Sequence, residues 1–274
     1  MKIEFTKMSG AGNDFVLVDN RSNLISDRSA TARAICDRRW GVGADGLLLI
    51  ERSEKASYKM MYYNADGSYG GMCGNGGRCV ARYAVLQRIA PQEHAFEALD
   101  HIYDVSLHND NIRLSMKDPA DFRLNLKLSV LRRRITCHFV DTGSPHVVVP
   151  VQSLPRSRGG LSSVNVPVLG KLIRFHKAFT PNGTNVNFIE LIDGTSLKIR
   201  TYERGVEAET LACGTGAIAS AVVGALIWDL KPPVKIVPAS SVPLSVDFIV
   251  RGKHVEKVTL TGPATVVFTG AMHV

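Results

Sequence analysis

The chain has 274 residues, of which 45% are hydrophobic and 21% are charged, and its formal net charge is +8. These fractions exclude disordered, collagen-like and fibrous proteins, and the length allows one large domain or two of about 130 residues, of which we favour two. The basic residues are spread out, apart from Arg132, Arg133 and Arg134, and are not clustered with aromatic side chains, which argues against a nucleic-acid partner.

Along the chain, most of the predicted elements are strands. Residues 1–5 alternate in polarity like a strand and lack the basic flank and apolar stretch of a signal peptide. Runs rich in β-branched and aliphatic residues predict further strands at 15–18, 47–50, 58–63, 147–151, 186–192, 197–202 and 255–260. Apolar residues three and four apart predict helices at 28–37, 76–87 and 215–227. This mixture indicates an α+β or α/β protein in which sheet dominates.

The most apolar stretch, residues 217–230, is too short to span a bilayer and contains Ser220 and Asp229. We therefore expect a buried helix there and no membrane association. The missing signal peptide and the unpaired cysteines described next lead us to expect a cytoplasmic location.

The chain has five cysteines, an odd number at scattered positions, without the C-x-x-C spacing of a zinc site. The expectation is reduced thiols and no bound metal. Buried cysteines are usually inert, and we assign Cys36, Cys79 and Cys137 to this class.

An internal repeat organises the sequence, because three short motifs recur in the same order in each half. Residues 12–15, 48–51 and 73–76 form the first set, and residues 143–146, 187–190 and 213–216 form the second. The repeat predicts two duplicated domains, residues 1–118 and 119–262, divided where Asp118 and Pro119 break the local pattern. The functional site is expected in the cleft between them.

Cys73 and Cys213 occupy equivalent places in the repeat, each followed by a glycine-rich turn that opens a helix. Unpaired N–H groups and the helix dipole at such a position stabilise negative charge, lower a thiol pKa and bind carboxylates. Two thiols on opposite sides of one carbon can remove an α-proton from one face and return a proton to the other. The pair therefore predicts an enzyme that inverts an amino-acid centre.

Other thiol chemistries fit the pattern less well. A cysteine protease or transferase needs one nucleophile with a histidine partner and gains nothing from a second thiol. A redox disulfide is disfavoured because C-x-x-C is absent and the cysteines lie in separate halves.

The assembled motifs resemble those of the diaminopimelate epimerase family over nearly the whole chain. The matching segments are 7–8 with 12–15, 41–46, 64–68, 73–79, 143–146, 185–188, 202–205, 209–210 and 212–216. The resemblance implies a fold of two pseudo-symmetric α/β domains of duplicated topology, each a mixed, mostly antiparallel sheet around a central helix. It also implies that a strand at residues 263–274 returns to the first half.

The activity implied by this resemblance is the interconversion of LL- and meso-2,6-diaminopimelate in lysine and peptidoglycan-precursor biosynthesis. It proceeds without pyridoxal phosphate or any other cofactor, in a homodimer. The residues carried over by motif are Cys73 and Cys213 as the acid/base pair, His146 and Glu203 as their supports, Asn13, Asn64, Asn187, Glu203 and Arg204 as substrate binders, and Gly74, Asn75, Gly214 and Thr215 as helix-end cradles for the carboxylate.

This chain departs from the family pattern at two positions. Ser144 stands where many members have asparagine, and Gly46 stands where some have glutamine. Neither change touches the two thiols or Arg204.

Two alternatives stay open at this point. A related two-thiol racemase would act on proline-like or other small acids, and it would not need the extra polar contacts that Asn13, Asn64, Asn187 and Arg204 offer to a second amino-acid end. A non-catalytic ligand-binding or nucleic-acid-binding protein would be indifferent to loss of Cys73 and Cys213.

Overall fold

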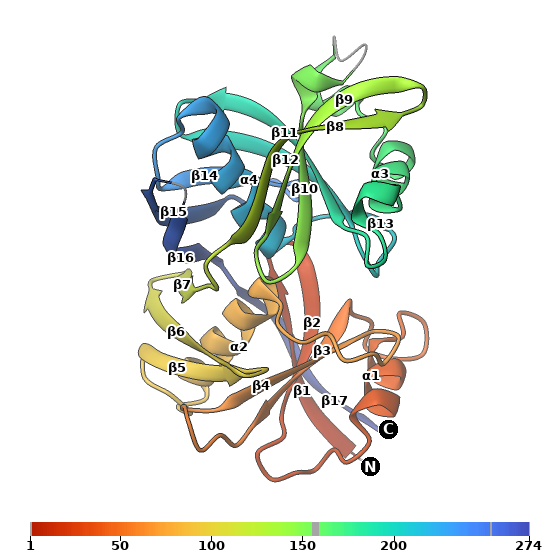
Figure 1. Cartoon of the computed structure of the whole chain (residues 1–274). Coiled ribbons are helices and arrows are strands. Elements are labelled where there is room, and N and C mark those ends of the chain that lie inside the picture. Colours follow the sequence, from red (N-terminus) through yellow and green to blue (C-terminus); the bar gives the residue numbers. More distant parts are fainter. Residues whose placement is uncertain (1, 155–158, 253, 274) are drawn as a thin grey trace. The chain divides into compact units, whose positions relative to one another are not determined.

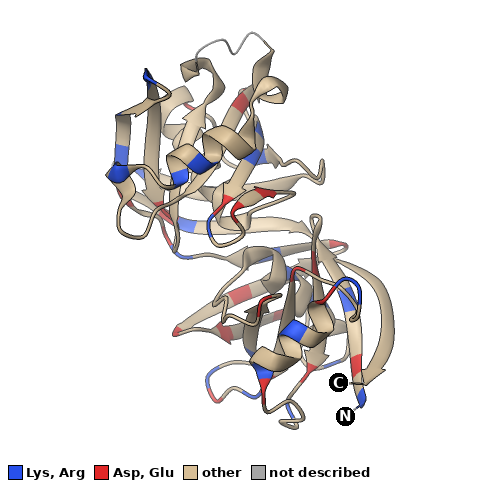
Figure 2. Cartoon of the chain, turned by 90° about the vertical axis from the view of Figure 1, so that its right-hand side faces the viewer, with Lys and Arg blue, Asp and Glu red and all other residues tan. Residues whose placement is uncertain are grey.

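The computed structural model describes residues 2–154, 159–252 and 254–273 (Figure 1). The chain divides into two compact units: the first consists of Met1–Ser115 with Thr261–Val274, and the second of Met116–Leu260. Each unit combines one mixed sheet with two longer helices. In the view of Figure 2, basic and acidic positions are interspersed over both units. The three consecutive arginines Arg132, Arg133 and Arg134 are exposed, at the turn between β8 (Ala120–Val130) and β9 (Arg133–Asp141).

The first unit is built on a central run of four strands. Strand β1 pairs antiparallel with β2, β2 runs parallel to β3, and β3 is antiparallel to β4. The carboxy-terminal strand β17 pairs antiparallel with the other edge of β1. The elements of this unit are β1 (Lys2–Gly10), β2 (Asn13–Asp19), α1 (Arg28–Cys36), β3 (Gly46–Glu51), β4 (Lys59–Asn64), α2 (Gly74–Leu86), β5 (Glu93–Ala98), β6 (His101–His108), β7 (Asn111–Ser115) and β17 (Thr265–His273).

The second unit repeats this arrangement. Strand β9 is antiparallel to β10, β10 runs parallel to β11, and β11 is antiparallel to β12. Its elements are β8 (Ala120–Val130), β9 (Arg133–Asp141), β10 (Pro145–Pro150), α3 (Val166–Arg174), β11 (Asn185–Asp193), β12 (Ser196–Glu203), β13 (Ala208–Thr210), α4 (Gly214–Trp228), β14 (Val234–Val237) and β15 (Leu244–Arg251), with short 3₁₀ turns at Val151–Ser153, Gly160–Ser163 and Lys177–Phe179. Strand β16 (His254–Pro263) leads out of this unit.

The same register holds in both units. Phe15 pairs with Gly46 across β2 and β3, and His146 pairs with Asn185 across β10 and β11. The predicted fold class, duplicated domains with mixed and mostly antiparallel sheets, is therefore confirmed.

Each sheet is wrapped around one helix. Helix α2 packs against β1, β2, β3, β4 and β7, and α4 packs against β9, β10, β11, β12, β14 and β15. Most residues of α4 are buried on every side, which explains why its sequence is apolar without a polar face. No helix within the described ranges is long and apolar enough to cross a bilayer.

The sequence patterns missed several elements. Helix α3 is amphipathic and begins with Asn165, whose side chain accepts from Val168 N, with a proline in the first turn. These start signals are visible in the sequence, but the helix has only nine residues. Strands β5 to β9 and β13 to β15 were also not predicted, because polar and charged residues interrupt their short apolar runs.

Candidate active site

Both repeated cysteines occupy the residue immediately before a helix. Cys73 precedes α2 with φ −124° and ψ 120°, and Cys213 precedes α4 with φ −122° and ψ 116°. The backbone angles are thus nearly identical, but only the Cys73 side chain accepts a hydrogen bond from a helix-start N–H, that of Gly76, whereas Cys213 makes no such bond. Gly74 and Asn75 open α2 and Gly214 and Thr215 open α4, and their role as carboxylate cradles stays a prediction.

The Cys73 sulfur lies among amide groups. Its Sγ atom is 3.7 Å from Asn13 Oδ1, and it accepts a hydrogen bond from Gly76 N at 3.5 Å. Asn13 also accepts from Asn75 Nδ2 at 3.3 Å and donates to Asp45 Oδ2 at 2.6 Å. Two predicted site residues, Asn13 and Asn75, are thus brought together with Cys73.

A completely buried arginine lies one helical turn beyond Cys73. Arg78 donates to Gly74 O at 3.1 Å, to Asn75 Oδ1 at 2.9 Å and to Pro263 O at 3.4 Å. Burial lowers its pKa from the usual arginine value. Sequence reasoning missed this residue, although a charged side chain inside an otherwise buried helix start was a visible signal.

The Cys213 sulfur lies beside a hydroxyl group. Thr215 Oγ1 is 3.5 Å from Cys213 Sγ and 2.9 Å from His146 Nε2. His146 Nδ1 is in turn 3.0 Å from Asn187 Nδ2. The structure therefore joins Cys213, Thr215, His146 and Asn187 in one hydrogen-bond chain within the second unit.

His146 is fully buried at the start of β10. Burial lowers its pKa to about 3, and the positive charge of Arg204 acts in the same direction. The ring is therefore neutral at physiological pH, and it cannot take part as a cation.

Asn187 is fully buried, and all of its amide groups have partners inside the unit. Nδ2 donates to Val147 O at 3.1 Å as well as to His146, and Oδ1 accepts from Thr201 Oγ1 at 3.0 Å. These contacts give Asn187 the features of a residue that orients His146. Its predicted role as a substrate binder stays a prediction.

Asn185, two residues earlier on β11, was not among the expected site residues. Its Nδ2 donates to Ser144 Oγ at 3.0 Å, and its Oδ1 accepts from Arg204 N at 2.8 Å. Because side chains two residues apart point to the same face of a strand, the Asn185 and Asn187 pair was a signal that the sequence offered. Asn185 links the short Ser144 side chain to the turn that carries Arg204.

Glu203 and Arg204 follow one another at the end of β12 and are partly buried. Glu203 Oε2 accepts from Thr210 Oγ1 at 2.9 Å. The positive charge of Arg204 lies close enough to His146 to lower the pKa of that ring.

Asn64 ends β4 and is held by local contacts. Its Oδ1 accepts from Tyr62 Oη at 2.7 Å, and its Nδ2 donates to Ser68 Oγ at 2.9 Å. A side chain at the neighbouring Gly46 would collide with the Tyr62 ring and Tyr63 O, which explains the glycine at this position. The prediction that Asn64 binds substrate stays a prediction.

The three other cysteines are buried, as expected for structural residues. Cys36 is 2% exposed, and Cys79 and Cys137 are fully buried. Burial raises the pKa of each thiol to about 12. These three sulfurs are therefore poor bases and poor nucleophiles at neutral pH.

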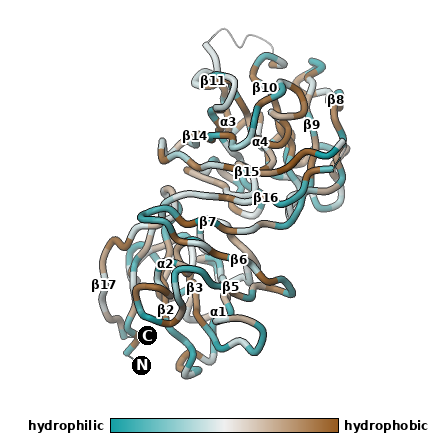
Figure 3. The backbone as a smooth tube through the Cα atoms, turned by 90° about the vertical axis from the view of Figure 1, so that its left-hand side faces the viewer, coloured by the Kyte–Doolittle hydropathy of each residue, from teal (hydrophilic) through white to brown (hydrophobic). Residues whose placement is uncertain are grey.

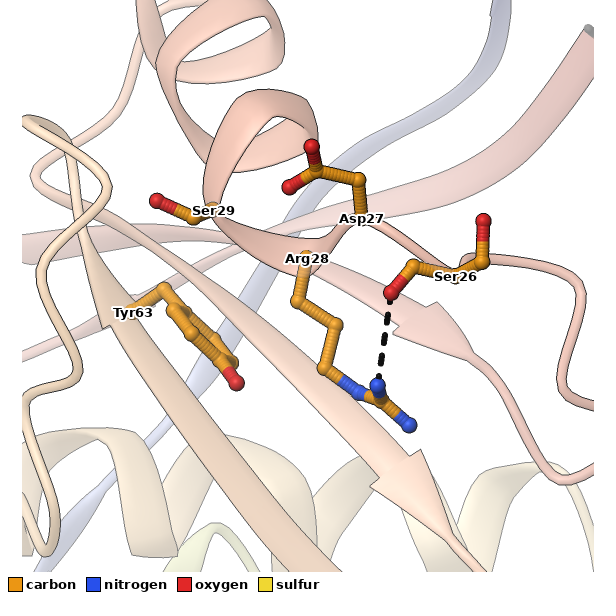
Figure 4. A pocket seen from close by; sticks show the side chains of 5 residues that line it. All are labelled: Ser26, Asp27, Arg28, Ser29 and Tyr63. Carbon is orange, nitrogen blue, oxygen red and sulfur yellow. Dashed lines mark hydrogen bonds between the residues drawn. The ribbon is translucent and has the colours of Figure 1, made fainter.

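Two surface depressions are lined by residues other than the two site cysteines. One of about 510 Å³ lies at the start of α1 and is shown in Figure 4, lined by Ser26, Asp27, Arg28, Ser29 and Tyr63. Arg28 Nε is already paired with Glu51 Oε1 at 2.6 Å. A second depression of about 390 Å³ lies between α3 and β13.

The fold is shared with solved structures of low sequence identity. A probable proline racemase from Agrobacterium radiobacter has a TM-score of 0.73 at 16% identity, over 99% of this chain and 92% of that one. A PhzF-family phenazine biosynthesis protein from Bacillus anthracis has a TM-score of 0.72 at 16% identity, over the full length of both chains. The class of protein is therefore the duplicated diaminopimelate epimerase-like fold.

Sequence comparison identifies the family within this class. The profile of the diaminopimelate epimerase family matches residues 5–122 and 138–239. The diaminopimelate epimerase of Chlorobaculum tepidum is 42% identical over 97% of this chain and 99% of its own length, and that of Aquifex aeolicus is 38% identical over 98% of both. The chain belongs to the diaminopimelate epimerase family.

Proposed function

We propose that this protein is a diaminopimelate epimerase, an isomerase of lysine biosynthesis, and that Cys73 and Cys213 are its two acid/base groups. The observation that carries the proposal is the repeated placement of a cysteine directly before a helix, in the same strand register, once in each unit. Family membership supplies the substrate, LL- or meso-2,6-diaminopimelate.

In the proposed mechanism, one sulfur removes the α-proton as a thiolate while the other delivers a proton from its thiol to the opposite face. The carbanion formed between these steps spreads its charge onto the substrate carboxylate. N–H groups at the starts of α2 and α4 stabilise that charge, since they point along the helix axis at its positive end. The mechanism assigns no step to a cofactor.

The remaining predicted residues have proposed binding roles. Arg204 pairs with a substrate carboxylate through two parallel hydrogen bonds. Asn13 and Asn64 bind the distal amino-acid end, and Glu203 binds substrate near Cys213. Residues 1–118 with the returning strand, and residues 119–262, are proposed as the two catalytic halves, which close on the substrate to exclude water.

We further propose a homodimer that uses the exposed face of β17. Every residue of this strand is exposed or half-exposed, and Val266, Val267 and Phe268 are 36%, 55% and 46% exposed. Figure 3 shows β17 along the margin of the first unit. Exposed apolar strands are typical of surfaces that pair with another chain. A Val267→Lys variant should shift sedimentation from dimer to monomer, and wild-type protein that sediments as a monomer would contradict this assembly.

The function is tested by epimerisation of LL-diaminopimelate, followed as exchange of the α-proton with solvent deuterium. Cys73→Ala and Cys213→Ala should each lower turnover on the order of 10²- to 10⁴-fold, because each removes one proton-transfer group. Cys137→Ala is the matched control and should keep full turnover. Retained activity in either site variant would refute the two-thiol assignment, and turnover of proline in place of diaminopimelate would identify a different racemase.

A further inference from the structure

The side-chain contacts of the two site cysteines have opposite polarity. Cys73 Sγ contacts the carbonyl oxygen of the Asn13 side chain, and Cys213 Sγ contacts the hydroxyl of Thr215. A carbonyl oxygen can only accept a hydrogen bond, whereas a hydroxyl can donate one. Which atoms donate follows from the partners further along each chain of contacts.

In the first unit, the orientation of Asn13 is fixed by an acidic partner. Its amide nitrogen lies 2.6 Å from Asp45 Oδ2, and Asp45 is ion-paired with Arg38 at 2.9 Å. An ionised carboxylate only accepts, so the Asn13 nitrogen must lie on that side. The Asn13 oxygen is therefore the atom next to Cys73.

The orientation of Asn75 is fixed by a basic partner. Arg78 Nη2 lies 2.9 Å from Asn75 Oδ1, and a guanidinium only donates. Asn75 must therefore donate its amide N–H to Asn13 Oδ1, at 3.3 Å. The Asn13 oxygen is an acceptor in both of its contacts, and a protonated Cys73 thiol satisfies it, whereas a thiolate would repel it.

In the second unit, the orientation of Asn187 is fixed by the main chain. Its nitrogen lies 3.1 Å from Val147 O, which only accepts, and its oxygen accepts from Thr201 Oγ1 at 3.0 Å. The second N–H of Asn187 therefore donates to His146 Nδ1 at 3.0 Å.

The proton of His146 is then on Nε2. Because Nδ1 accepts from Asn187 and the buried ring is neutral, Nε2–H donates to Thr215 Oγ1 at 2.9 Å. The Thr215 hydroxyl accepts this bond, which leaves its own single proton to donate to Cys213 Sγ, 3.5 Å away. A hydroxyl donor stabilises a thiolate more than a thiol, because hydrogen bonds to ionised groups are the stronger ones.

Both sulfurs also have charged groups near them. Each sulfur stands before a helix start, Arg78 lies in electrostatic reach of Cys73, and Arg204 lies in electrostatic reach of His146. Glu203 on β12 accepts a hydrogen bond from Thr210 Oγ1. The Gly76 N–H on Cys73 is compatible with a thiol, because sulfur accepts and donates at the same time.

We propose that in the free enzyme Cys213 holds the thiolate and Cys73 holds the thiol. This assignment rests on the proposed function, because it takes these two sulfurs to be the acid/base pair. Turnover from this form begins when Cys213 takes the substrate α-proton and ends when Cys73 gives its proton to the opposite face. The enzyme is then left with a Cys213 thiol and a Cys73 thiolate, and it returns to its starting form by losing one proton to water and gaining one from it.

The test is the pH dependence of alkylation by iodoacetamide without substrate, with Cys73 and Cys213 quantified separately by peptide mass spectrometry. The rise of each rate with pH gives an apparent pKa that does not depend on how accessible the sulfur is. Cys213 should titrate at least about one pKa unit below Cys73, which is about a tenfold difference in thiolate fraction. Equal values, or a lower value for Cys73, would overturn the proposal without any variant having to fold.

Variants of Thr215 test whether its hydroxyl lowers the apparent pKa of Cys213. Thr215→Val should raise the apparent pKa of Cys213 by about one unit and leave Cys73 unchanged, and Thr215→Ser should restore it. The matched control is Thr142→Val, since the Thr142 hydroxyl donates to Thr215 O at 3.2 Å. It should leave both profiles unchanged, and an equal shift in this control would assign the effect to packing and overturn the hydroxyl role.

The readout also separates this inference from the proposed function. A protein whose Cys213 titrates first but which does not epimerise diaminopimelate would overturn the function and leave the assignment of the thiolate intact. An active epimerase whose Cys73 titrates first would do the reverse.

Discussion

The two units share a backbone arrangement but differ in what lies behind the cysteine. Phe15 and Leu48 are buried apolar residues of β2 and β3 in the first unit. At the corresponding positions of β10 and β11, the second unit has His146 and Asn187, which lead by hydrogen bonds to Cys213. The pairing register is the same in both units, so the difference arises from side chains alone.

In the first unit, a buried polar side chain lies on the helix instead of the sheet. Arg78 on α2 corresponds to Ile218 on α4, and both are fully buried. Behind Cys73, the hydrogen bonds run from Arg78 and Asn75 on the helix to Asn13 on β2, whereas behind Cys213 they run from Asn187 and His146 on the sheet to Thr215 on α4. A duplicated fold can therefore surround two like thiols with different polar groups, and the proposed one-acid, one-base reaction would use this difference.

Removal of the buried arginine should have the largest effect. Arg78→Met removes one hydrogen-bond donor from each of three acceptors: Gly74 O, Asn75 Oδ1 and Pro263 O. The free energy of unfolding should fall by about 3 kcal/mol or more, measured by urea denaturation. In the second unit, Ile218→Met at the matched position should cost less than about 1.5 kcal/mol. Equal losses would show that Arg78 acts only by filling space.

The two helix-start glycines should respond differently to a methyl group. An added Cβ at Gly216 would overlap Asn187 Oδ1 and approach Cys213 Sγ to 3.3 Å, whereas at Gly76 it would meet the end of the Leu48 side chain at 3.0 Å. Gly216→Ala should therefore lower stability by about 2 kcal/mol and disturb the His146 contacts, while the flexible leucine lets Gly76→Ala cost less. Thermal unfolding of both variants, with Gly194→Ala as an open-space control, decides the point.

The buried histidine should make the second unit sensitive to acid. Its pKa is about 3 in the folded protein against a usual value of 6.5, so the unfolded chain binds more protons between these values. Stability is full above about pH 6.5 and falls as the pH drops, by about 2 kcal/mol at pH 5. His146→Gln should lack this component of the pH dependence, and an unchanged slope in that variant would contradict it.

The smallest effect is expected at the far end of the same hydrogen-bond chain. Thr201→Val removes the donor to Asn187 Oδ1 and should cost about 1 kcal/mol in denaturant unfolding. Because Asn187 keeps its bond to Val147 O, the tautomer of His146 should persist, and epimerase turnover should change by less than about threefold. A large loss of turnover would show that Thr201 is needed to hold the amide in place.

The sequence was sufficient for the duplicated fold and the two cysteine positions, because glycine-rich turns before apolar helices are local signals. It predicted a helix at 76–87 where α2 spans Gly74–Leu86, and one at 215–227 where α4 spans Gly214–Trp228. It could not show that Asn187 lies behind His146 or that Arg78 and Pro263 meet. Those contacts join residues 41 and 185 positions apart and depend on tertiary packing.

The pairing of β17 with β1 has a consequence for biosynthesis. The second unit consists of one continuous segment, so all of its strands have been synthesised before Thr265–His273. The first unit cannot complete its sheet until Thr265–His273 has been made, because β17 pairs with β1. During translation the amino-terminal segment therefore waits with one edge of β1 unpaired. A chain that stops within Thr265–His273 would therefore have a complete second unit and a first unit that lacks strand β17.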